Sequence, residues 1–183
     1  MNTTIQSMTD EYLQPSLELV QQVFTDYKDE AEGKLTRLLV EEIRAKRFYM
    51  PELEIIAVCG GEVVGYTNFS RFHLEGKYED RLLLLSPVAV KTQLQRRHIS
   101  KRMIEYGFEK AKLLGFEAVL VEGNPRNYRA RGFVTAADYG ILPGRSVHLP
   151  AIECLMVKAL KEGALEDIQG TVDYFDYKAL MEE

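Results

Sequence analysis

Hydrophobic and polar residues alternate along this chain with two periods, one typical of helices and one of strands. A spacing of three to four residues, which predicts an amphipathic helix, occurs twice near the start of the chain. Its members are Leu13, Leu17, Val20 and Phe24 for a first helix, and Leu35, Leu38, Leu39 and Ile43 for a second. Pro15 fits the first turn of the first helix, where a missing N–H costs nothing.

Short apolar, β-branched runs follow these two helices. They predict strands over residues 54–59, 63–70, 82–90, 118–121, 132–134 and 154–157, with a further short strand over 4–7. Gly60 and Gly61 form a hairpin signal between the first two long strands. A helical pattern runs from Ile99 to Leu114 and ends at Gly115, the residue type preferred at a helix C-terminus. Residues 125–131 allow one or two more helical turns.

This order of elements predicts an α/β fold with a central mixed, twisted sheet flanked by helices. The hairpin makes the early strands antiparallel. The helix over 99–114 makes the strands at 82–90 and 118–121 parallel neighbours, joined in the right-handed sense. We expect a single domain over residues 1–162. Residues 163–183 are expected to form a C-terminal extension packed on the same domain, since Tyr174, Phe175 and Tyr177 offer apolar surface.

Composition narrows the class of protein further. The 183 residues are 46% hydrophobic and 28% charged, which is ordinary for a globular chain, and the net charge is −5. An acidic balance argues against general nucleic-acid binding. No apolar run approaches the ~20 residues of a membrane helix, and residues 1–10 lack a signal-peptide pattern. We therefore expect a cytoplasmic protein that does not bind membranes.

One segment, residues 84–102, carries more chemistry than any other. An apolar strand ends at Val90, a short cationic stretch follows, and a helix opens near Ile99. Unpaired N–H groups and the dipole at a helix start favour an anion such as a phosphate. Residues 91–102 contain cations and no acidic residue: Lys91, Arg96, Arg97, Lys101 and Arg102. The simpler alternative is a solvated helix end.

The order of short motifs resembles the GNAT superfamily of N-acetyltransferases. The matching segments are Val88-Ala89-Val90, Gln95 to Ser100, Leu113 to Val119, Gly123-Asn124-Pro125, and Tyr128 to Phe133. The chain is most similar to a bacterial branch with a Gly-Asp-Pro-x-Tyr-Tyr-x-x-x-Gly-Phe loop. That branch also tends to end in a pattern matched here by Gly163-Ala164-Leu165 and by Gly170 to Tyr174. The resemblance covers nearly the whole chain and implies a single GNAT-like domain.

The resemblance implies acetyl-CoA as acyl donor and a primary amine, of a small molecule or a peptide, as acceptor. The pantetheine arm would lie along the strand ending at Val90, and the pyrophosphate on the backbone amides from Arg96 to Lys101. Asn124 matches a position that often touches the cofactor. The implied cofactor-binding residues are Val88, Ala89, Val90, Gln95, Arg96, Arg97, His98, Ile99, Ser100, Lys101 and Asn124. Tyr128 matches the tyrosine that protonates the departing thiolate.

The chemistry of acyl transfer explains these residue types. Attack on a thioester creates an oxyanion, which a backbone N–H such as that of Val88 could stabilise. Tyr128 can help as a close, concerted proton donor, although a packed core tyrosine is the simpler interpretation. Glu122, at the end of its strand, is either a base that acts directly or through water, or, as the simpler interpretation, a solvated or ion-paired carboxylate. The sequence contains neither a pattern typical of a nucleophilic residue nor the spacing of metal ligands, so we expect neither a catalytic nucleophile nor a bound metal.

His98 is the main departure from the family pattern. It stands where such loops carry glycine, which lets the backbone approach a pyrophosphate. An imidazole there could obstruct the anion or, if protonated, bind it. Besides an active enzyme, two alternatives stay open: a catalytically idle CoA-binding sensor or scaffold, and a protein–protein interaction module on the same fold. The acceptor is not readable from the sequence, and a homodimer is left open.

Overall fold

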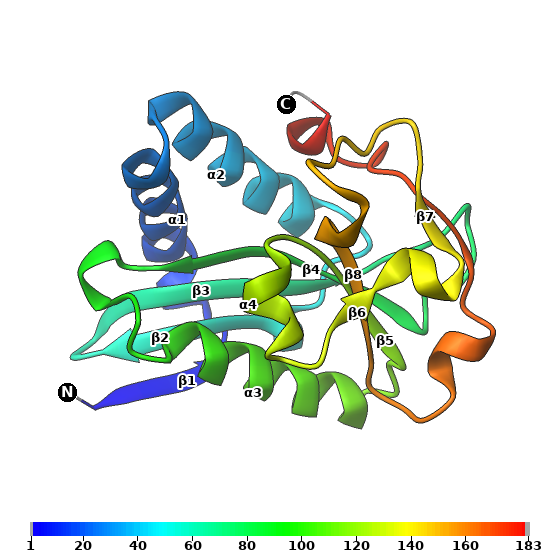
Figure 1. The fold of residues 1–183 in the computed structure, drawn as a ribbon. Coiled ribbons are helices and arrows are strands. Elements are labelled where there is room, and N and C mark those ends of the chain that lie inside the picture. The colour runs from blue at the N-terminus through cyan, green and yellow to red at the C-terminus, as the bar shows by residue number, and fades with distance from the viewer. Residues whose placement is uncertain (1, 182–183) are drawn as a thin grey trace. The chain divides into compact units, whose positions relative to one another are not determined.

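The computed structural model of the chain describes residues 2–181. Its strands pair in the order β1-β2-β3-β4-β5-β8-β6, while β7 and β9 pair separately (Figure 1). Antiparallel and parallel pairs both occur in the larger sheet, so the predicted α/β fold with a mixed sheet is confirmed. The chain divides into two compact units, Met1–Ser70 with Pro87–Lys110, and Arg71–Ser86 with Ala111–Glu183. The two units are described in turn.

The first unit joins an antiparallel meander to three helices. The β2–β3 turn is made by Gly60 and Gly61, whose φ angles of 59° and 81° suit glycine, as the hairpin signal predicts. The elements are β1 (Thr3–Ser7), α1 (Leu13–Tyr27), α2 (Glu30–Ala45), β2 (Glu54–Cys59), β3 (Glu62–Arg71, whose last residue is in the second unit), the second half of β4 (Leu82–Val90) and most of α3 (Ile99–Leu113).

Helices cover both faces of the meander in this unit, with α1 and α2 on one side and α3 on the other (Figure 1). From α1, Leu17 and Val20 pack in one buried cluster with Tyr66 of β3. On the opposite face α3 lies very close to β3. A Cβ atom on Gly107 of α3 would overlap the ring of Phe69. Glycine therefore sets the separation between this helix and the sheet.

A buried carboxylate links α2 to the strands. Glu54 is fully buried and accepts hydrogen bonds from Arg44 at 2.8 Å, Tyr49 at 2.5 Å and Tyr66 at 2.6 Å. Burial, together with the adjacent Glu54 carboxylate, raises the pKa of both tyrosines above the usual value, so both stay protonated donors. Removing one partner from such a buried ion pair typically costs ~3–5 kcal/mol. The network therefore fixes the end of α2 on β2 and β3.

The second unit holds the remaining strands. β4 and β5 pair in parallel, with Leu82–Leu84 opposite Ala118–Leu120, which confirms the predicted parallel neighbours. β8 pairs antiparallel with both β5 and β6. The elements are the first half of β4, β5 (Ala118–Glu122), α4 (Pro125–Arg129), β6 (Val134–Thr135), β7 (Ile141–Pro143), β8 (Leu155–Ala159) and β9 (Gly170–Val172).

The C-terminal segment lies against this unit. β9 pairs in parallel with β7, and Tyr174 and Tyr177 are buried, with 5% and 1% of their surface exposed. Phe175, between them, is half exposed and lies under the guanidinium of Arg145. A division of the chain at residues 162 and 163 stays a prediction, and residues 182–183 of the predicted extension lie outside the described residues.

Candidate functional site

The loop between β4 and α3, residues 91–98, belongs to the first unit. Its backbone is unusual because Arg96 and His98 both adopt left-handed φ angles, 62° and 60°. A non-glycine residue rarely does so, although histidine is among the more tolerant. His98 thus adopts the backbone conformation for which a glycine is normally used.

The amides of this loop are available to an anion. The carbonyl of His98 accepts the first helical hydrogen bond of α3, from Arg102 N–H at 3.1 Å. Within residues 2–181, the N–H groups of Arg96, Arg97, His98, Ile99 and Lys101 make no hydrogen bond. Alternating left-handed residues turn successive N–H groups into a concave nest, a known anion-binding arrangement. The nest is followed directly by the N-terminus of α3, whose dipole adds to it.

The five cations of this stretch differ in their partners. Lys91 pairs with Glu62 at 2.5 Å, Lys101 lies 3.8 Å from Glu105, and Arg102 donates to the Thr3 carbonyl at 2.8 Å. The exposed Arg96 and Arg97 form no side-chain hydrogen bond or ion pair among the residues that the structure describes. The sequence predicts one patch of five cations. Among the described residues, the structure leaves the side chains of two of them, Arg96 and Arg97, without a partner beside the nest.

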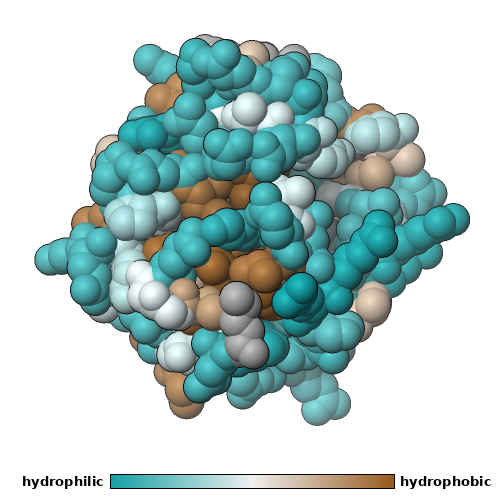
Figure 2. Space-filling model, turned by 90° about the vertical axis from the view of Figure 1, so that its left-hand side faces the viewer, coloured by the Kyte–Doolittle hydropathy of each residue, from teal (hydrophilic) through white to brown (hydrophobic). Residues whose placement is uncertain are grey.

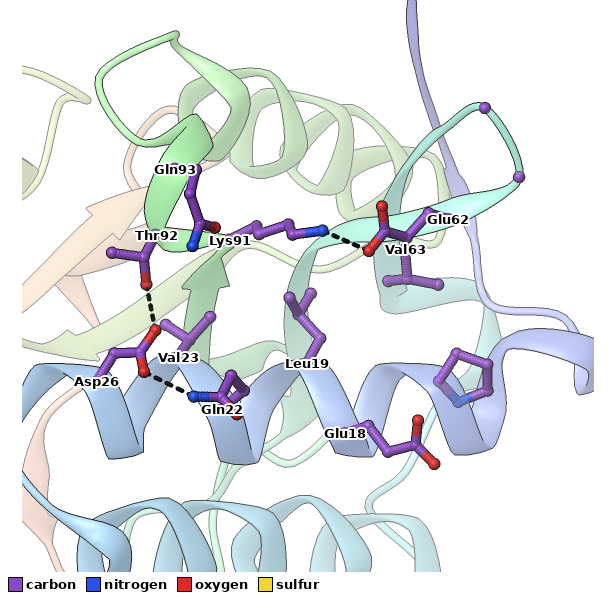
Figure 3. Close-up of a pocket in the computed structure, with 13 residues that line it drawn as sticks. Glu18, Leu19, Gln22, Val23, Asp26, Glu62, Val63, Lys91, Thr92 and Gln93 are labelled. Carbon is purple, nitrogen blue, oxygen red and sulfur yellow. Dashed lines mark hydrogen bonds and ion pairs between the residues drawn. The ribbon is translucent and has the colours of Figure 1, made fainter.

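The start of the loop is anchored to the rest of the unit. The side-chain amide of Gln95 donates to the Val90 carbonyl at 3.3 Å, and Thr92 donates to Asp26 of α1 at 2.8 Å. With the Lys91–Glu62 pair, these bonds hold the loop to the end of β4, to α1 and to the hairpin. Figure 3 shows the bonds of Thr92 and Lys91. The nest therefore sits on a fixed base.

A cavity of about 750 Å³ lies beside these anchors, between α1, the β2–β3 turn and the first residues of the loop. On this side of the molecule, hydrophobic surface is recessed between hydrophilic side chains (Figure 2). Figure 3 shows three carboxylates among the lining residues, Glu18, Asp26 and Glu62, against a single lysine. The nest residues 95–101 do not line the cavity, and its acidic lining is unsuited to a polyanion. The lining residues come from three segments that are far apart in the sequence, so no local sequence pattern predicted this cavity.

In the second unit, the end of β5 leads directly into α4. Asn124 is the N-cap of this short helix, because its side-chain oxygen accepts from the N–H of Arg126 at 3.0 Å. Pro125 occupies the first helical position, which needs no N–H donor. The sequence predicts Asn124 as a cofactor contact. The structure gives its side-chain oxygen a capping role, and the contact with a cofactor stays a prediction.

Tyr128 lies on α4 and is held in place by its ring. The ring packs edge-on against Phe133, with centroids 5.5 Å apart, and covers the backbone of Gly123, where a Cβ atom would overlap it. Burial raises the pKa of the Tyr128 phenol, and the nearby Arg131 guanidinium, 5.8 Å from the ring centre, opposes part of this rise. Tyr128 is therefore a protonated donor at neutral pH.

Glu122, the last residue of β5, has a partner that sequence analysis did not identify. Its carboxylate accepts a hydrogen bond from the hydroxyl of Tyr174 at 3.0 Å. Tyr174 is far away in sequence, so no local spacing relates the two residues. Gly123 was noticed only as part of a motif, although its missing side chain is what admits the ring of Tyr128.

The predicted site residues thus fall into two groups. Val88, Ala89, Val90 and residues 95–101 lie together in the first unit, at the end of β4 and in the loop. Asn124 and Tyr128 lie together on α4 of the second unit. Among residues 2–181, the structure contains no cluster of three or more His, Cys, Asp or Glu side chains able to hold a metal ion. It likewise contains no helix long and apolar enough to cross a bilayer.

Comparison with known proteins places this fold in a class of acyl-transfer enzymes. The sequence model of the acetyltransferase (GNAT) family matches residues 17–139. The chain therefore belongs to the GNAT acetyltransferase family, so the predicted resemblance to this family is confirmed, while the loop motif of the bacterial branch stays a prediction.

Individual relatives agree with this assignment. The chain is 31% identical over 107 residues to "Uncharacterized N-acetyltransferase YjhQ" of Escherichia coli, a match that covers 58% of this chain and only 57% of that protein. It is 26% identical over 153 residues to "Uncharacterized N-acetyltransferase YhbS" of the same species, covering 82% of this chain and 85% of the relative.

Solved structures show the same fold. The crystal structure of E. coli YhbS in complex with CoA superposes with a TM-score of 0.81, at 23% identity, over 95% of this chain and 90% of that one. A GNAT family acetyltransferase from Brucella melitensis in complex with acetyl-CoA gives a TM-score of 0.72, at 21% identity, over 97% of each chain. CoA or acetyl-CoA is thus the ligand of both similar structures, in agreement with the predicted cofactor.

Proposed function

We propose that the protein transfers an acetyl group from acetyl-CoA to a primary amine by direct attack of the amine on the thioester, with Tyr128 as general acid. The observation that carries this proposal is the nest formed by the unbonded amides of Arg96, Arg97, His98, Ile99 and Lys101. A pyrophosphate is the kind of ligand that such a nest accepts. Arg96 and Arg97 supply matching positive charge.

The strand before the loop would hold the arm of the cofactor. Acetyl-CoA supplies an activated acetyl thioester. Its extended pantetheine arm would bond the backbone of Val88, Ala89 and Val90, as an added strand does. The register of β4 with β5 ends at Leu84, four residues before Val88, which supports this proposal. The N–H of Val88 would then donate to the oxygen on which negative charge develops.

The proton balance defines what the side chains must do. A bond forms between the amine nitrogen and the carbonyl carbon, and the carbon–sulfur bond breaks. Alkyl amines have a pKa of about 10.4, so at neutral pH the ammonium group must lose one proton before attack, and the nitrogen loses a second proton as the amide forms. One of these two protons restores the proton that Tyr128 gives to the thiolate, and the other needs an acceptor. The departing thiolate takes its proton from Tyr128. At ordinary values this transfer is uphill by ~1.5 pKa units, about 2 kcal/mol. Burial of Tyr128 raises its pKa and increases the gap, so the transfer must be concerted with bond cleavage.

Thermal unfolding with and without acetyl-CoA tests the donor. A ligand at a hundredfold excess over its Kd stabilises by about 2.7 kcal/mol, which for a chain of this size raises Tm by about 5–10 °C. Free acetate at the same concentration is the control and should not shift Tm. The absence of a shift at millimolar acetyl-CoA would overturn the proposal.

Thiol release then tests turnover. Acetyl-CoA is incubated with a panel of small amines and lysine-containing peptides, and free CoA is measured with a thiol reagent. Release that depends on the amine establishes the transferase. A thermal shift without release by any amine would instead identify a catalytically idle CoA-binding protein. The amine acceptor, a cytoplasmic location and a homodimer stay predictions.

A further inference from the structure

We propose that Tyr174 is a positioning residue that holds Glu122 as the acceptor of the proton lost by the substrate amine. This inference rests on the proposed function and adds the base that the proposed mechanism requires. It concerns a contact between the end of β5 and the C-terminal segment, both within the second unit.

Glu122 is placed where an open α/β sheet presents its chemistry. It is the last residue of β5, at the carboxyl end of a strand that pairs in parallel with β4. Ligands of open sheets bind beyond the carboxyl ends of their parallel strands. The carboxylate is half-buried and accepts the Tyr174 hydroxyl on Oε2. A carboxylate has about four acceptor positions, so this hydrogen bond does not by itself use up the capacity to receive a proton.

Tyr174 is itself fixed from two sides. Its backbone N–H donates to the hydroxyl of Ser146 at 2.8 Å, and that hydroxyl donates to Asp173 at 2.6 Å. Its ring packs in the buried core of the unit, with its centroid 6.2 Å from that of Phe72. The hydroxyl therefore has little freedom to leave Glu122. A packed core tyrosine needs only its ring, whereas this one also directs its polar end at a carboxylate.

Gly123 separates the proposed base from the proposed acid. Its N–H donates to the Cys154 carbonyl at 2.9 Å, so the pairing of β5 with β8 continues one residue past Glu122. Successive side chains of an extended strand point to opposite faces. A Cβ on Gly123 would overlap the Tyr128 ring, so Tyr128 covers the face opposite to that of Glu122. Because the amine nitrogen and the thioester sulfur are bonded to the same carbon during transfer, both groups would have to reach one point beyond the end of β5, where ligands of open sheets bind.

The contacts described above bring titratable groups of other segments near Glu122. Tyr174 and, behind it, Asp173 belong to the C-terminal segment, Cys154 precedes β8, and Tyr128 belongs to α4. A hydroxyl that donates to a carboxylate stabilises the charged form, which is the form that accepts a proton. Loss of that donor therefore makes the carboxylate protonate at a higher pH, and activity would disappear earlier as the pH falls.

Tyr174→Phe is the central test because it removes the hydroxyl and keeps the ring. We expect kcat to fall about tenfold and the acidic limb of the pH–rate profile to move to higher pH by up to about one unit. The Kd for acetyl-CoA should not change. Tyr78→Phe is the matched control, since the Tyr78 hydroxyl donates over the same 3.0 Å to a backbone carbonyl, that of Asp167. It should leave both the rate and the pH profile as in the wild type.

A double-mutant cycle separates positioning from general destabilisation. Glu122→Gln keeps the shape and the hydrogen bond but cannot take up a proton, and should lower kcat about a hundredfold. In that background, Tyr174→Phe should have no further effect on kcat. Independent, additive losses, or an unshifted pH limb in Tyr174→Phe, would overturn the proposal. If Tyr174→Phe does not fold, Glu122→Gln decides alone, because full activity there excludes Glu122 as base.

Failure of this inference and failure of the proposed function give different results. A wild-type protein that releases no thiol with any amine contradicts the transferase. A wild-type protein that does so, together with a fully active Glu122→Gln variant, contradicts only the assignment of Glu122 and Tyr174.

Discussion

The loop after β4 and the end of β5 differ in the kind of atoms that they present. The loop presents backbone: its amides form the nest, its side chains are mostly exposed, and its shape depends on two left-handed residues. The end of β5 presents side chains, Glu122 and Tyr128, whose positions depend on packing and on hydrogen bonds from other segments. A site formed by backbone amides tolerates changes of side chain that keep the torsion angles of the loop. A site formed by side chains tolerates almost no substitution of the residues that form it.

The largest effect is therefore expected at the end of β5. Tyr128→Phe should lower kcat about a hundredfold, the contribution typical of a positioned general acid, while the Kd for acetyl-CoA stays within twofold. Steady-state thiol release and equilibrium titration measure the two quantities. Tyr139→Phe is the control, because that ring is 40% exposed and lies in the same unit. Unchanged turnover in Tyr128→Phe would remove this residue from the mechanism.

Gly123→Ala should have the next largest effect. The added methyl group occupies the space of the Tyr128 ring, so the ring must move and kcat should fall about tenfold. The double variant with Tyr128→Phe supplies the control for mechanism: if the methyl group acts by displacing the hydroxyl, it should add nothing there. A further tenfold loss in the double variant would show that Gly123 matters in another way.

In the loop, charge should matter moderately. Replacing Arg96 and Arg97 together by Gln should weaken acetyl-CoA binding about tenfold, because each exposed arginine contributes ~0.5–1 kcal/mol to an anion contact. The salt dependence of the Kd should decrease, and kcat at saturating acetyl-CoA should not change. Lys34→Gln is the control, since its ammonium group is paired with Glu30 in the same unit and is not one of the anchors of the loop. Equal losses in both variants would contradict the distinction between free and paired cations.

The smallest effects are expected at His98, where two substitutions separate backbone from side chain. His98→Gly keeps the left-handed conformation, so Tm and the Kd for acetyl-CoA should stay close to wild type. His98→Val places a β-branched residue at φ 60° and should cost about 1–3 kcal/mol, or roughly 2–10 °C in Tm. A more than tenfold loss of affinity in His98→Gly would instead make the imidazole a ligand of the cofactor.

Local patterns predicted most of the fold. The helical and strand periods located α1, α2, α3 and the long strands, and the two glycines of the hairpin located its turn. β7 and β9 were missed because each contains three residues and is stabilised by its partner rather than by its own sequence. The strand predicted from Gly132 begins two residues later, at Val134, after a left-handed glycine with φ 86°.

The site was predictable where it is local in sequence. Strand, cationic loop and helix follow one another within residues 84–102, and the family pattern singles out Tyr128, whose catalytic role stays a prediction. Long-range contacts were not predictable. The pairing of Lys91 with Glu62 depends on how the hairpin meets the end of β4, and the bond between Tyr174 and Glu122 spans much of the chain. Neither contact has a periodic signal, because both arise from tertiary structure.

The left-handed conformation of His98 affects how related proteins should be recognised. A search pattern that demands glycine at this position would pass over chains like this one, although His98 adopts a left-handed conformation that glycine adopts without strain. Asn and Asp share the tolerance of histidine for this region of torsion space. A pattern that accepts Gly, Asn, Asp or His would describe the torsion angle rather than one amino acid, and it would also suggest which substitutions a variant library should sample here.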